Sequence, residues 1–409
     1  MEKPFNERTG TIGNQLKQHL EKLATEIGER PVGSQGNRKA VTYAAQILQS
    51  QGWDVQLGAF ECIDWEHGSV HLQADGRMYP AYVSPYSLSC EATAELVVAA
   101  DLAELRSANT RGRILLITGE LSKEQIMPKN FVFYNPDEHR QIISLLEEQQ
   151  PLAIICATGA GEGLSSGPNP YPVFEDGDFH IPSVYMKKDD AKDLIKCQGE
   201  EVSLSFYARR IPATGHNLVA KKNGREEGRI ILCAHIDTKM NTPGALDNAS
   251  GVAVLLALAE ELQQITTDYD IEIIAFNGED YYAVPGQMLY IRQQDGNFDD
   301  VRLVINIDGA GHTDSKTALS FYNLSEKKIE AFMKNAGCFI TLTRGEAWYE
   351  GDHSIFLQQG MPCMAVTSSN VREEVMAISH TPKDTPDKVD PSLLEDLAAY
   401  LKLLVECNI

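Results

Sequence analysis

Short apolar runs alternate with longer amphipathic segments through the second half of the chain. Segments with apolar residues at helical spacing lie at 248–264, 324–336 and 391–406. Runs that are apolar throughout, as in strands buried on both faces of a sheet, lie at 229–234, 271–276, 302–307 and 362–367. This alternation predicts an α/β domain with a mixed, mostly parallel sheet that is flanked by helices.

Residues 1–62 fit the same domain. Apolar positions at helical spacing predict helices at 13–27 and 36–52, with Gly52 at the C-terminal position that helices prefer. The turn-rich sequence GERPVGSQGN separates the two helices, and the alternating run DVQLGAFEC after the second predicts a strand. The N-terminal segment is therefore expected to supply two helices and one strand.

Residues 63–205 have a different character. Short strand candidates such as AELVVAA, RILLITG and LAIICATG alternate with turns, and one helix is predicted at 137–148. We interpret this segment as an inserted β-rich domain that acts as a lid over a main domain formed by residues 1–62 and 206–409. The Gly-rich stretch at 158–167 has no Gly-Lys-Ser/Thr ending and no dinucleotide-binding spacing, so no phosphate loop is expected there.

Length and composition agree with two soluble globular domains. A chain of 409 residues with 43% apolar content is too long for one ordinary core. The longest apolar stretches, such as VAVLLALA, are much shorter than the roughly 18–20 residues that span a bilayer, so no membrane segment is expected. The polar N-terminus lacks the apolar core of a secretory signal, which predicts a cytoplasmic protein, although a chain whose leader had been trimmed would look the same.

Charge and cysteine content narrow the range of partners. A formal net charge of −22 argues against nucleic acid and against an anionic membrane, because both require a basic surface. An acidic surface favours metal cations and substrates with a free amino group, but it also serves solubility. Eight scattered cysteines without a CxxC pair predict reduced, mostly buried thiols.

The strongest functional signal is a set of acidic residues and histidines that follow the predicted strands. In open α/β sheets, ligands bind beyond the carboxyl ends of the strands, so these side chains are expected to meet. Imidazoles and carboxylates at that edge are what a two-zinc hydrolytic site requires. The set consists of His235 and Asp237 after GRIILCA, Asp247 in GALDNASG, Glu279 and Asp280 after IEIIAFNG, Asp308 after RLVINI and His380 in ISHTPKDT.

Local spacing indicates what these side chains can do. His235 and Asp237 are two residues apart, so an extended backbone points both the same way, and one can orient the other or both can contact metal. Asp247 precedes a helix and can bridge two cations. Glu279 and Asp280 are adjacent at a strand end, where neighbouring side chains diverge, so one can bind metal while the other takes a proton from water.

Each of these residues has an ordinary structural explanation when it is considered alone. Asp247 can cap a helix, and Asp308 can accept hydrogen bonds from backbone amides at a strand end. Glu279 and Asp280 can belong to a solvated turn. The complete set, in this order and at these strand ends, favours a metal site.

Six segments occur in an order that is similar to that of a known enzyme family. They are AHID, GALDNASGVAVLLALAEEL, IEIIAFNGEDYYAVPGQ, VINIDGAG, GDHSIFLQQGMPCMAV and SHTPKDTPDKVD. With them the chain resembles the M28 family of zinc aminopeptidases over most of residues 214–409, and the N-terminal ERPVGSQGN also fits. The inserted domain more loosely resembles the protease-associated insert that some members carry.

The resemblance implies a zinc exopeptidase fold and an aminopeptidase that hydrolyses the N-terminal peptide bond of peptides with a free N-terminus. Glu279 would be the general base that deprotonates a zinc-activated water and later protonates the leaving amine. Asp237 would sit behind His235 and fix its tautomer. The two zinc ions per chain would be held by His235 and Asp308, by Asp280 and His380, and by Asp247 as the bridge between them.

Two positions depart from the pattern of the family. The family usually has Glu where this chain has Asp280, which is one methylene shorter, so we expect altered reach rather than loss of the metal. Some members place a tyrosine immediately before the last histidine to steady the tetrahedral intermediate, whereas this chain has Ser379. Tyr349, Tyr281 and Tyr282 are the candidates for the missing donor.

Residues around the predicted site receive more ordinary interpretations. Asp352 and His353 match a DH pair of the family and are expected to shape the pocket, with packing and substrate contact equally expected for His353. Arg344 is expected at the surface rather than against a substrate carboxylate. Cys363 is expected to be buried filler rather than a nucleophile, because no activating base is adjacent.

Other functions stay open on sequence evidence. The same fold is compatible with a single-zinc acyl transferase that resembles glutaminyl cyclases, and with carboxypeptidase or dipeptidase action. It is also compatible with a non-catalytic, receptor-like module, against which the complete set of five ligands and Glu279 argues. A homo-oligomer is compatible with the sequence as well.

Overall fold

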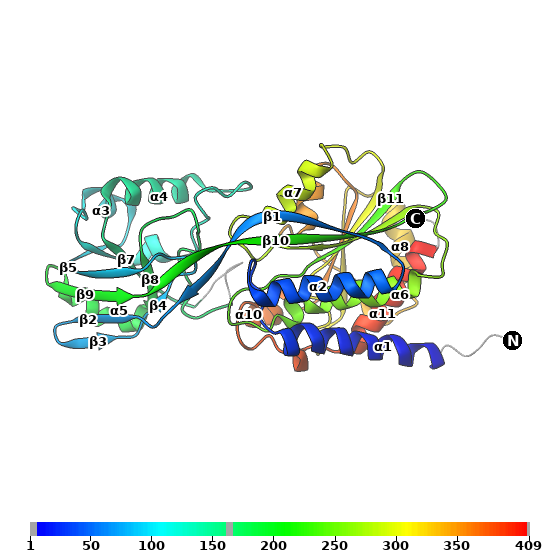
Figure 1. Cartoon of the computed structure of the whole chain (residues 1–409), viewed down its shortest axis with the longest axis horizontal. Coiled ribbons are helices and arrows are strands. Elements are labelled where there is room, and N and C mark those ends of the chain that lie inside the picture. Colours follow the sequence, from blue (N-terminus) through cyan, green and yellow to red (C-terminus); the bar gives the residue numbers. More distant parts are fainter. Residues whose placement is uncertain (1–5, 161–166, 407–409) are drawn as a thin grey trace. The chain divides into compact units, whose positions relative to one another are not determined.

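The chain divides into two compact units in the computed structural model, which describes residues 6–160 and 167–406 (Figure 1). Unit 1 comprises Met1–Cys62 and Thr214–Ile409, and unit 2 comprises Ile63–Ala213. The sequence predicts the second boundary at 205/206. The division falls instead within strand β10 (Ala208–Lys222), where a continuous strand leaves no change of hydrophobic pattern to mark it.

Unit 1 contains a mixed sheet of eight strands, and its class confirms the α/β prediction. The four strands that were predicted to be buried form its centre and run parallel to one another, while β10 and β14 run antiparallel to their central neighbours. The strand order is β1 (Asp54–His67), β10, β12 (Asp270–Phe276), β11 (Arg229–His235), β13 (Val301–Ile307), β16 (Cys363–Ser368), β14 (Thr317–Tyr322) and β15 (Leu342–Arg344).

The register of the central strands brings their carboxyl ends to one edge. His235, the last residue of β11, pairs with Phe276, the last residue of β12. On the other side of β11, Cys233 pairs with Asn306, which in turn pairs with Ala365 of β16. Residues that directly follow these strands are therefore brought together although they are far apart in sequence.

Helices cover both faces of this sheet. Helix α6 (Ser250–Leu262) is apolar on all sides and nearly all of it is buried, because α1 (Asn6–Glu21) and α11 (Pro391–Glu406) pack against it. Figure 1 shows α2 (Gln35–Ser50) beside this group and α7 (Pro285–Gln293) on the opposite face. The remaining α-helices with four or more residues in the described part of unit 1 are α8 (Glu326–Ala336) and α9 (His353–Leu357).

The entry to α2 is determined by its capping residue. The Ser34 side chain accepts a hydrogen bond from the backbone N–H of Asn37, so the helix begins at Gln35, within the GERPVGSQGN sequence. At the other end, Gly52 has a φ of 82°, the left-handed conformation that favours glycine. Arg30 lies in the turn before α2, and Asn37 lies in the first turn of the helix. The side chains of both residues reach into the other half of unit 1.

A buried histidine in this region predicts a pH dependence of folding. His19 on α1 is 6% exposed, and its Nδ1 lies 2.6 Å from the Tyr43 hydroxyl. Burial lowers the pKa of His19 from 6.5 to about 4, so the unfolded chain binds one more proton than the native state between these values. His19 therefore stabilises the protein fully above pH 6.5, and that contribution, roughly 3 kcal/mol, is lost as the pH falls towards 4.

The prediction is tested by chemical denaturation of the native protein and of a His19→Gln variant. Between pH 7 and pH 4.5 the native protein is expected to lose more free energy of unfolding than the variant. Parallel curves for the two proteins would remove His19 as the titrating group.

Unit 2 is built on a second mixed sheet. Its strands β5 to β8 run parallel in the sheet, and the remaining strands pair antiparallel. The sequence analysis named one of its helices, which is α4 (Asp137–Gln149), but not α3 (Leu102–Ser107) or α5 (Lys188–Leu194), which are too short to show a helical period. The strand order is β3 (Arg77–Tyr79), β2 (His71–Ala74), β9 (Glu201–Phe206), β5 (Cys90–Ala99), β6 (Ile114–Ile117), β7 (Ala153–Thr158), β8 (Ser183–Lys187) and β4 (Tyr82–Val83).

Two further features concern the described residues as a whole. None of the helices among them combines the length and the apolar content that crossing a membrane would take. The thiols of Cys90, Cys156, Cys197, Cys233 and Cys363 are free and buried, and that of Cys338 is free and exposed. Cys407 and most of the Gly-rich stretch at 158–167 lie outside the described residues.

Candidate metal centre

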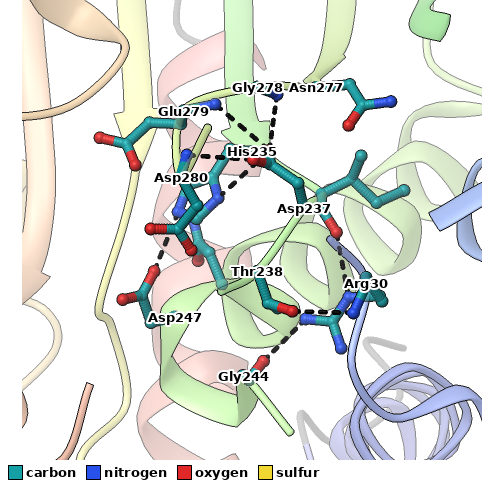
Figure 2. Close-up of polar contacts among 12 residues, drawn as sticks. Arg30, His235, Asp237, Thr238, Gly244, Asp247, Asn277, Gly278, Glu279 and Asp280 are labelled. Carbon is teal, nitrogen blue, oxygen red and sulfur yellow. Dashed lines mark hydrogen bonds and ion pairs between the residues drawn. The ribbon is translucent and has the colours of Figure 1, made fainter. Parts of the chain in front are cut away.

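The predicted site residues come together at the carboxyl edge of the central strands. Figure 2 shows His235, Asp237, Asp247, Glu279 and Asp280 there. His235 ends β11, and the Glu279–Asp280 pair lies in the turn after β12. Asp308 directly follows β13, and Asp247 lies in the short helical turn η5 (Ala245–Ala249) that leads into α6. His380 comes from a loop after the short helix α10 (Met376–Ile378).

Asp247 lies between the two histidines, with one carboxylate oxygen directed to each. Its Oδ1 is 3.1 Å from Nε2 of His235, and its Oδ2 is 3.2 Å from Nε2 of His380. A second carboxylate completes each side, because His235 Nε2 is 3.5 Å from Asp308 and His380 Nε2 is 3.0 Å from Asp280. The result is two groups, each of one imidazole and one carboxylate, joined by the shared Asp247.

The donor atoms of these groups fit metal ions. The ligand atoms of His235, Asp247 and Asp280 all lie within 4.8 Å of one another. Three buried atoms of the site make no hydrogen bond among the described residues. They are the two ring nitrogens of His235 and Oδ2 of Asp280. Imidazole nitrogen with carboxylate oxygen is the donor set of catalytic zinc sites, so two cations sharing Asp247 would satisfy Nε2 of His235 and Oδ2 of Asp280.

The charges of the site also call for cations. Burial lowers the pKa of His235 and His380, but the surrounding aspartates outweigh it and raise both pKa values well above the ordinary value. Burial would raise the pKa of Asp247, yet its close contacts with the imidazoles of His235 and His380 hold it far below its usual range. Burial, together with Asp247 and Asp280, raises the pKa of Asp308. Protons thus compensate negative charge here, and metal ions can replace them.

Asp237 holds the turn that carries the acidic pair. Its Oδ1 accepts hydrogen bonds from the backbone N–H groups of Gly278 and Glu279, at 2.8 Å and 3.3 Å, and its Oδ2 accepts one from Asp280 at 3.0 Å. Its distance to Nδ1 of His235 is 3.7 Å, which is longer than a hydrogen bond. Asp237 is fully buried, and its tightest contacts are to the backbone of the turn rather than to the imidazole.

Glu279 has its backbone and its side chain on opposite sides of this turn. Figure 2 shows its amide facing Asp237 while its carboxylate points away from that residue. Burial raises the pKa of Glu279 well above its ordinary value, and the charges of Asp280, Asp308 and Asp352 act in the same direction, against His235. A carboxyl group with a raised pKa holds its proton more tightly than an exposed one, as a proton donor to a leaving amine must.

Asp384 fixes the backbone next to Asp247, and the sequence analysis did not identify it. Its carboxylate accepts the N–H groups of Leu246, at 2.8 Å, and of Asp247, at 3.1 Å. It is fully buried, and burial, reinforced by the charge of Asp247, raises its pKa to about 7. On the other side of Asp247, Asn248 donates to the carbonyl of Ile307 at 2.7 Å. Asp384 lies four residues after His380 in SHTPKDTPDK, and this closeness to a predicted ligand is the sequence feature that could have identified it.

Buried asparagines form a second set that the sequence analysis missed. Asn277, at the end of β12, exchanges two side-chain hydrogen bonds with Asn37 of α2, at 2.8 Å and 2.9 Å. Its backbone N–H donates to Asn217 of β10, which also donates to the carbonyl of Gly286. This network joins the N-terminal segment to the turn before Glu279, and no sequence pattern signals it.

The DH pair packs beneath the site. His353 is fully buried, with Nε2 2.9 Å from the carbonyl oxygen of Trp348 and Nδ1 3.4 Å from the Asn306 side chain, so packing occupies both of its nitrogens. Asp352 accepts a hydrogen bond from Gln287 at 2.7 Å, and burial raises its pKa to about 7.

The remaining predicted residues lie as follows. Tyr281 is buried with its ring 4.4 Å from that of Tyr282, whereas Tyr349 is 65% exposed. Arg344 is exposed and forms an ion pair with Glu326 at the surface, as expected. Burial raises the pKa of the Cys363 thiol to about 12, in agreement with a non-nucleophilic role. Ser379 is 9% exposed beside His380.

An α/β sheet with imidazoles and carboxylates gathered at the carboxyl edge of its strands defines a hydrolase of the metal-dependent class. The comparison with known families is more specific. Residues 217–405 match Peptidase family M28, and the chain resembles this family over that segment.

Individual proteins of known name agree with the family. Aminopeptidase YwaD of Bacillus subtilis is 22% identical over 397 residues, which cover 92% of this chain and 80% of the relative. The crystal structure of a zinc aminopeptidase from Bacillus subtilis superimposes with a TM-score of 0.74 at 21% identity. The match covers 97% of this chain and 96% of the chain in that structure. A glutaminyl cyclase of Porphyromonas gingivalis has a TM-score of 0.53 at 15% identity, with 97% and 98% covered.

Proposed function

We propose that the protein is a dizinc aminopeptidase that removes residues from peptides with a free N-terminus. The observation that carries this proposal is the position of Asp247, whose two oxygens are each directed to a different histidine within 3.2 Å. A carboxylate in this position is suited to bridge two cations. The relatives named as aminopeptidases, one of them a zinc enzyme, support the same assignment.

Five residues would hold the two ions. His235 and Asp308 would bind one, His380 and Asp280 the other, and Asp247 both. Zinc ions bound here would polarise the scissile carbonyl and make water a stronger nucleophile at neutral pH. Asp280, one methylene shorter than the usual glutamate, still lies 3.0 Å from Nε2 of His380, because Asp237 fixes its backbone N–H.

Glu279 would move the proton. Its carboxylate takes a proton from the attacking water as the oxygen bonds to the carbonyl carbon, and gives that proton to the nitrogen of the leaving amine as the C–N bond breaks. Its raised pKa suits this double task. Asp237 contributes by orientation, since its carboxylate binds the backbone on which Glu279 and Asp280 stand.

Substrate chemistry tests the proposal. Zinc-loaded protein is expected to hydrolyse at least one member of a panel of aminoacyl anilides and to shorten peptides stepwise from the N-terminus. N-acetylated forms of the same peptides, the matched control, are expected to stay intact because they lack the free amine. Hydrolysis of acetylated and free peptides at equal rates, or release of C-terminal residues, would contradict aminopeptidase action.

A glutaminyl-cyclase-like acyl transferase with one zinc is the second candidate. Its support is the shared fold, at a TM-score of 0.53 against 0.74 for the zinc aminopeptidase. Two imidazole–carboxylate groups around a shared Asp247 favour two ions over one. Metal content distinguishes the candidates, since one tightly bound zinc per chain and cyclisation of an N-terminal glutamine would favour the second.

A further inference from the structure

Arg30 is a buried cation whose side chain hydrogen-bonds to backbone carbonyls. It is 1% exposed and lies in the turn before α2, outside the segment 217–405 that matches the family. Among the described residues, every hydrogen bond of its guanidinium goes to a carbonyl oxygen, and none goes to a carboxylate. The acceptors are Leu23 at 3.0 Å, Gly28 at 2.7 Å, Ile236 at 3.0 Å, Pro243 at 2.8 Å and Gly244 at 2.9 Å.

Three of these carbonyls belong to the two segments that carry one of the metal groups. Ile236 stands between His235 and Asp237 at the end of β11. Pro243 and Gly244 lie directly before the turn that presents Asp247. Figure 2 shows the guanidinium between these segments, with dashed lines to both. One planar group thus connects the backbone behind the first histidine with the backbone before the bridging aspartate.

The backbone of Arg30 takes part in the same junction. Its N–H donates to the Thr238 hydroxyl at 2.8 Å, and its carbonyl accepts the N–H of Thr238 at 3.3 Å. The segment that leads to Asp247 is held from its far side by Asp384, which accepts the N–H groups of Leu246 and Asp247. Carbonyls of this segment are therefore bound by Arg30 and amides by Asp384.

A guanidinium fits this position for geometric reasons. It offers five N–H donors in a rigid plane, whereas a lysine ammonium offers three donors from a single point. Burial lowers the pKa of Arg30 to about 10, which leaves it charged at neutral pH. A positive charge near the site opposes the binding of cations, so any benefit to metal binding comes from the hydrogen bonds.

We propose that Arg30 is a positioning residue of the metal centre, which sets the separation between His235 and Asp247 by binding the carbonyls of both segments. The N-terminal turn would then be part of the site although it lies about 200 residues away in sequence. This inference rests on the proposed metal-binding function.

The test compares two arginine-to-lysine variants. Arg30→Lys keeps the charge but removes the planar fork. Arg229→Lys is the matched control, because Arg229 is also buried and lies at the start of β11, the end of the strand opposite to His235. Its side chain binds Glu272 and Gln294 and not the segments that carry His235 and Asp247. Zinc affinity is measured by competition with a chromophoric chelator, and the thermal midpoint of each metal-free protein is recorded.

Both variants are expected to lower the thermal midpoint, but only Arg30→Lys is expected to weaken zinc binding, by about 10-fold or more. If Arg30→Lys does not fold, Gly244→Ala replaces it, since a Cβ there lies 2.3 Å from Cγ2 of Thr238, 2.5 Å from the carbonyl oxygen of Asp247 and 2.9 Å from Nη2 of Arg30, and so crowds the junction that Arg30 spans. Zinc affinity within twofold of the native protein in the folded variant overturns the inference. A native protein that binds no zinc overturns the proposed function instead.

Discussion

Replacing Glu279 by Gln is expected to reduce turnover about 10²- to 10⁴-fold while both zinc ions stay bound. The amide keeps the size of the side chain, but it cannot take a proton from water. Glu279 is outside the proposed ligand set, and its backbone hydrogen bond to Asp237 does not depend on its side chain. The variant is assayed for hydrolysis of an aminoacyl anilide and for zinc content after gel filtration.

Glu272→Gln is the matched control for this experiment. Glu272 is a buried glutamate within β12, and it binds Arg229 and Tyr290 away from the site. We expect the control to lose stability and to keep its turnover per folded molecule. Unchanged turnover in Glu279→Gln would remove Glu279 from its proposed role, and loss of zinc would show that it acts as a ligand.

Replacing Asp247 by Asn is expected to weaken zinc binding at both positions, by more than the 10- to 100-fold typical of residues that only orient ligands. The carboxylate directs one oxygen to each histidine group, whereas the amide has a single oxygen and no charge. Asp308 at His235 and Asp280 at His380 contribute most to the raised pKa values of the two histidines, and Asp247 contributes to both. Equilibrium dialysis against buffered zinc measures the effect.

Asp308→Asn provides the comparison. Asp308 lies 3.5 Å from Nε2 of His235, whereas the ion pairs of His380 among the described residues are with Asp247 and Asp280. We therefore expect replacement of Asp308 to weaken one zinc position and to spare the other. If Asp247→Asn and Asp308→Asn lose the same single ion, Asp247 is not a bridge and the two-metal arrangement is wrong.

Much of this site is predictable from the sequence because of the fold. His235, Asp308 and the Glu279–Asp280 pair each directly follow an apolar run, and parallel strands in register bring such positions to one edge. The apolar runs were evident because central strands are buried on both faces. Shorter elements at the periphery, such as β15 and α3, have too few residues to show a period.

The residues that support the site were not predictable in the same way. Arg30 finds three of its five carbonyl partners more than 200 positions away, and Asn37 pairs with Asn277 across 240. A hydrogen bond between distant side chains leaves no pattern along the chain, and backbone carbonyls as acceptors place no demand on the partner's residue type. The Asp237 carboxylate lies 3.7 Å from Nδ1 of His235, which it was predicted to contact, because it accepts hydrogen bonds from amides in the turn after β12 instead.

Several expectations from the sequence stay predictions. They are the protease-associated identity of the inserted domain and its role as a lid, the cytoplasmic location, the absence of nucleic-acid partners and a homo-oligomeric state. For the site itself, Tyr281 and Tyr349 differ in exposure, at 4% and 65%, and their replacement by Phe is the means to identify the donor to the tetrahedral intermediate.

The most direct test of the two-metal account is a titration of metal-free protein with zinc, followed by the rate of aminoacyl anilide hydrolysis. The account predicts no hydrolysis without zinc and a rate that reaches its plateau at two equivalents per chain. A plateau at one equivalent, or hydrolysis that persists in the metal-free protein, would contradict it.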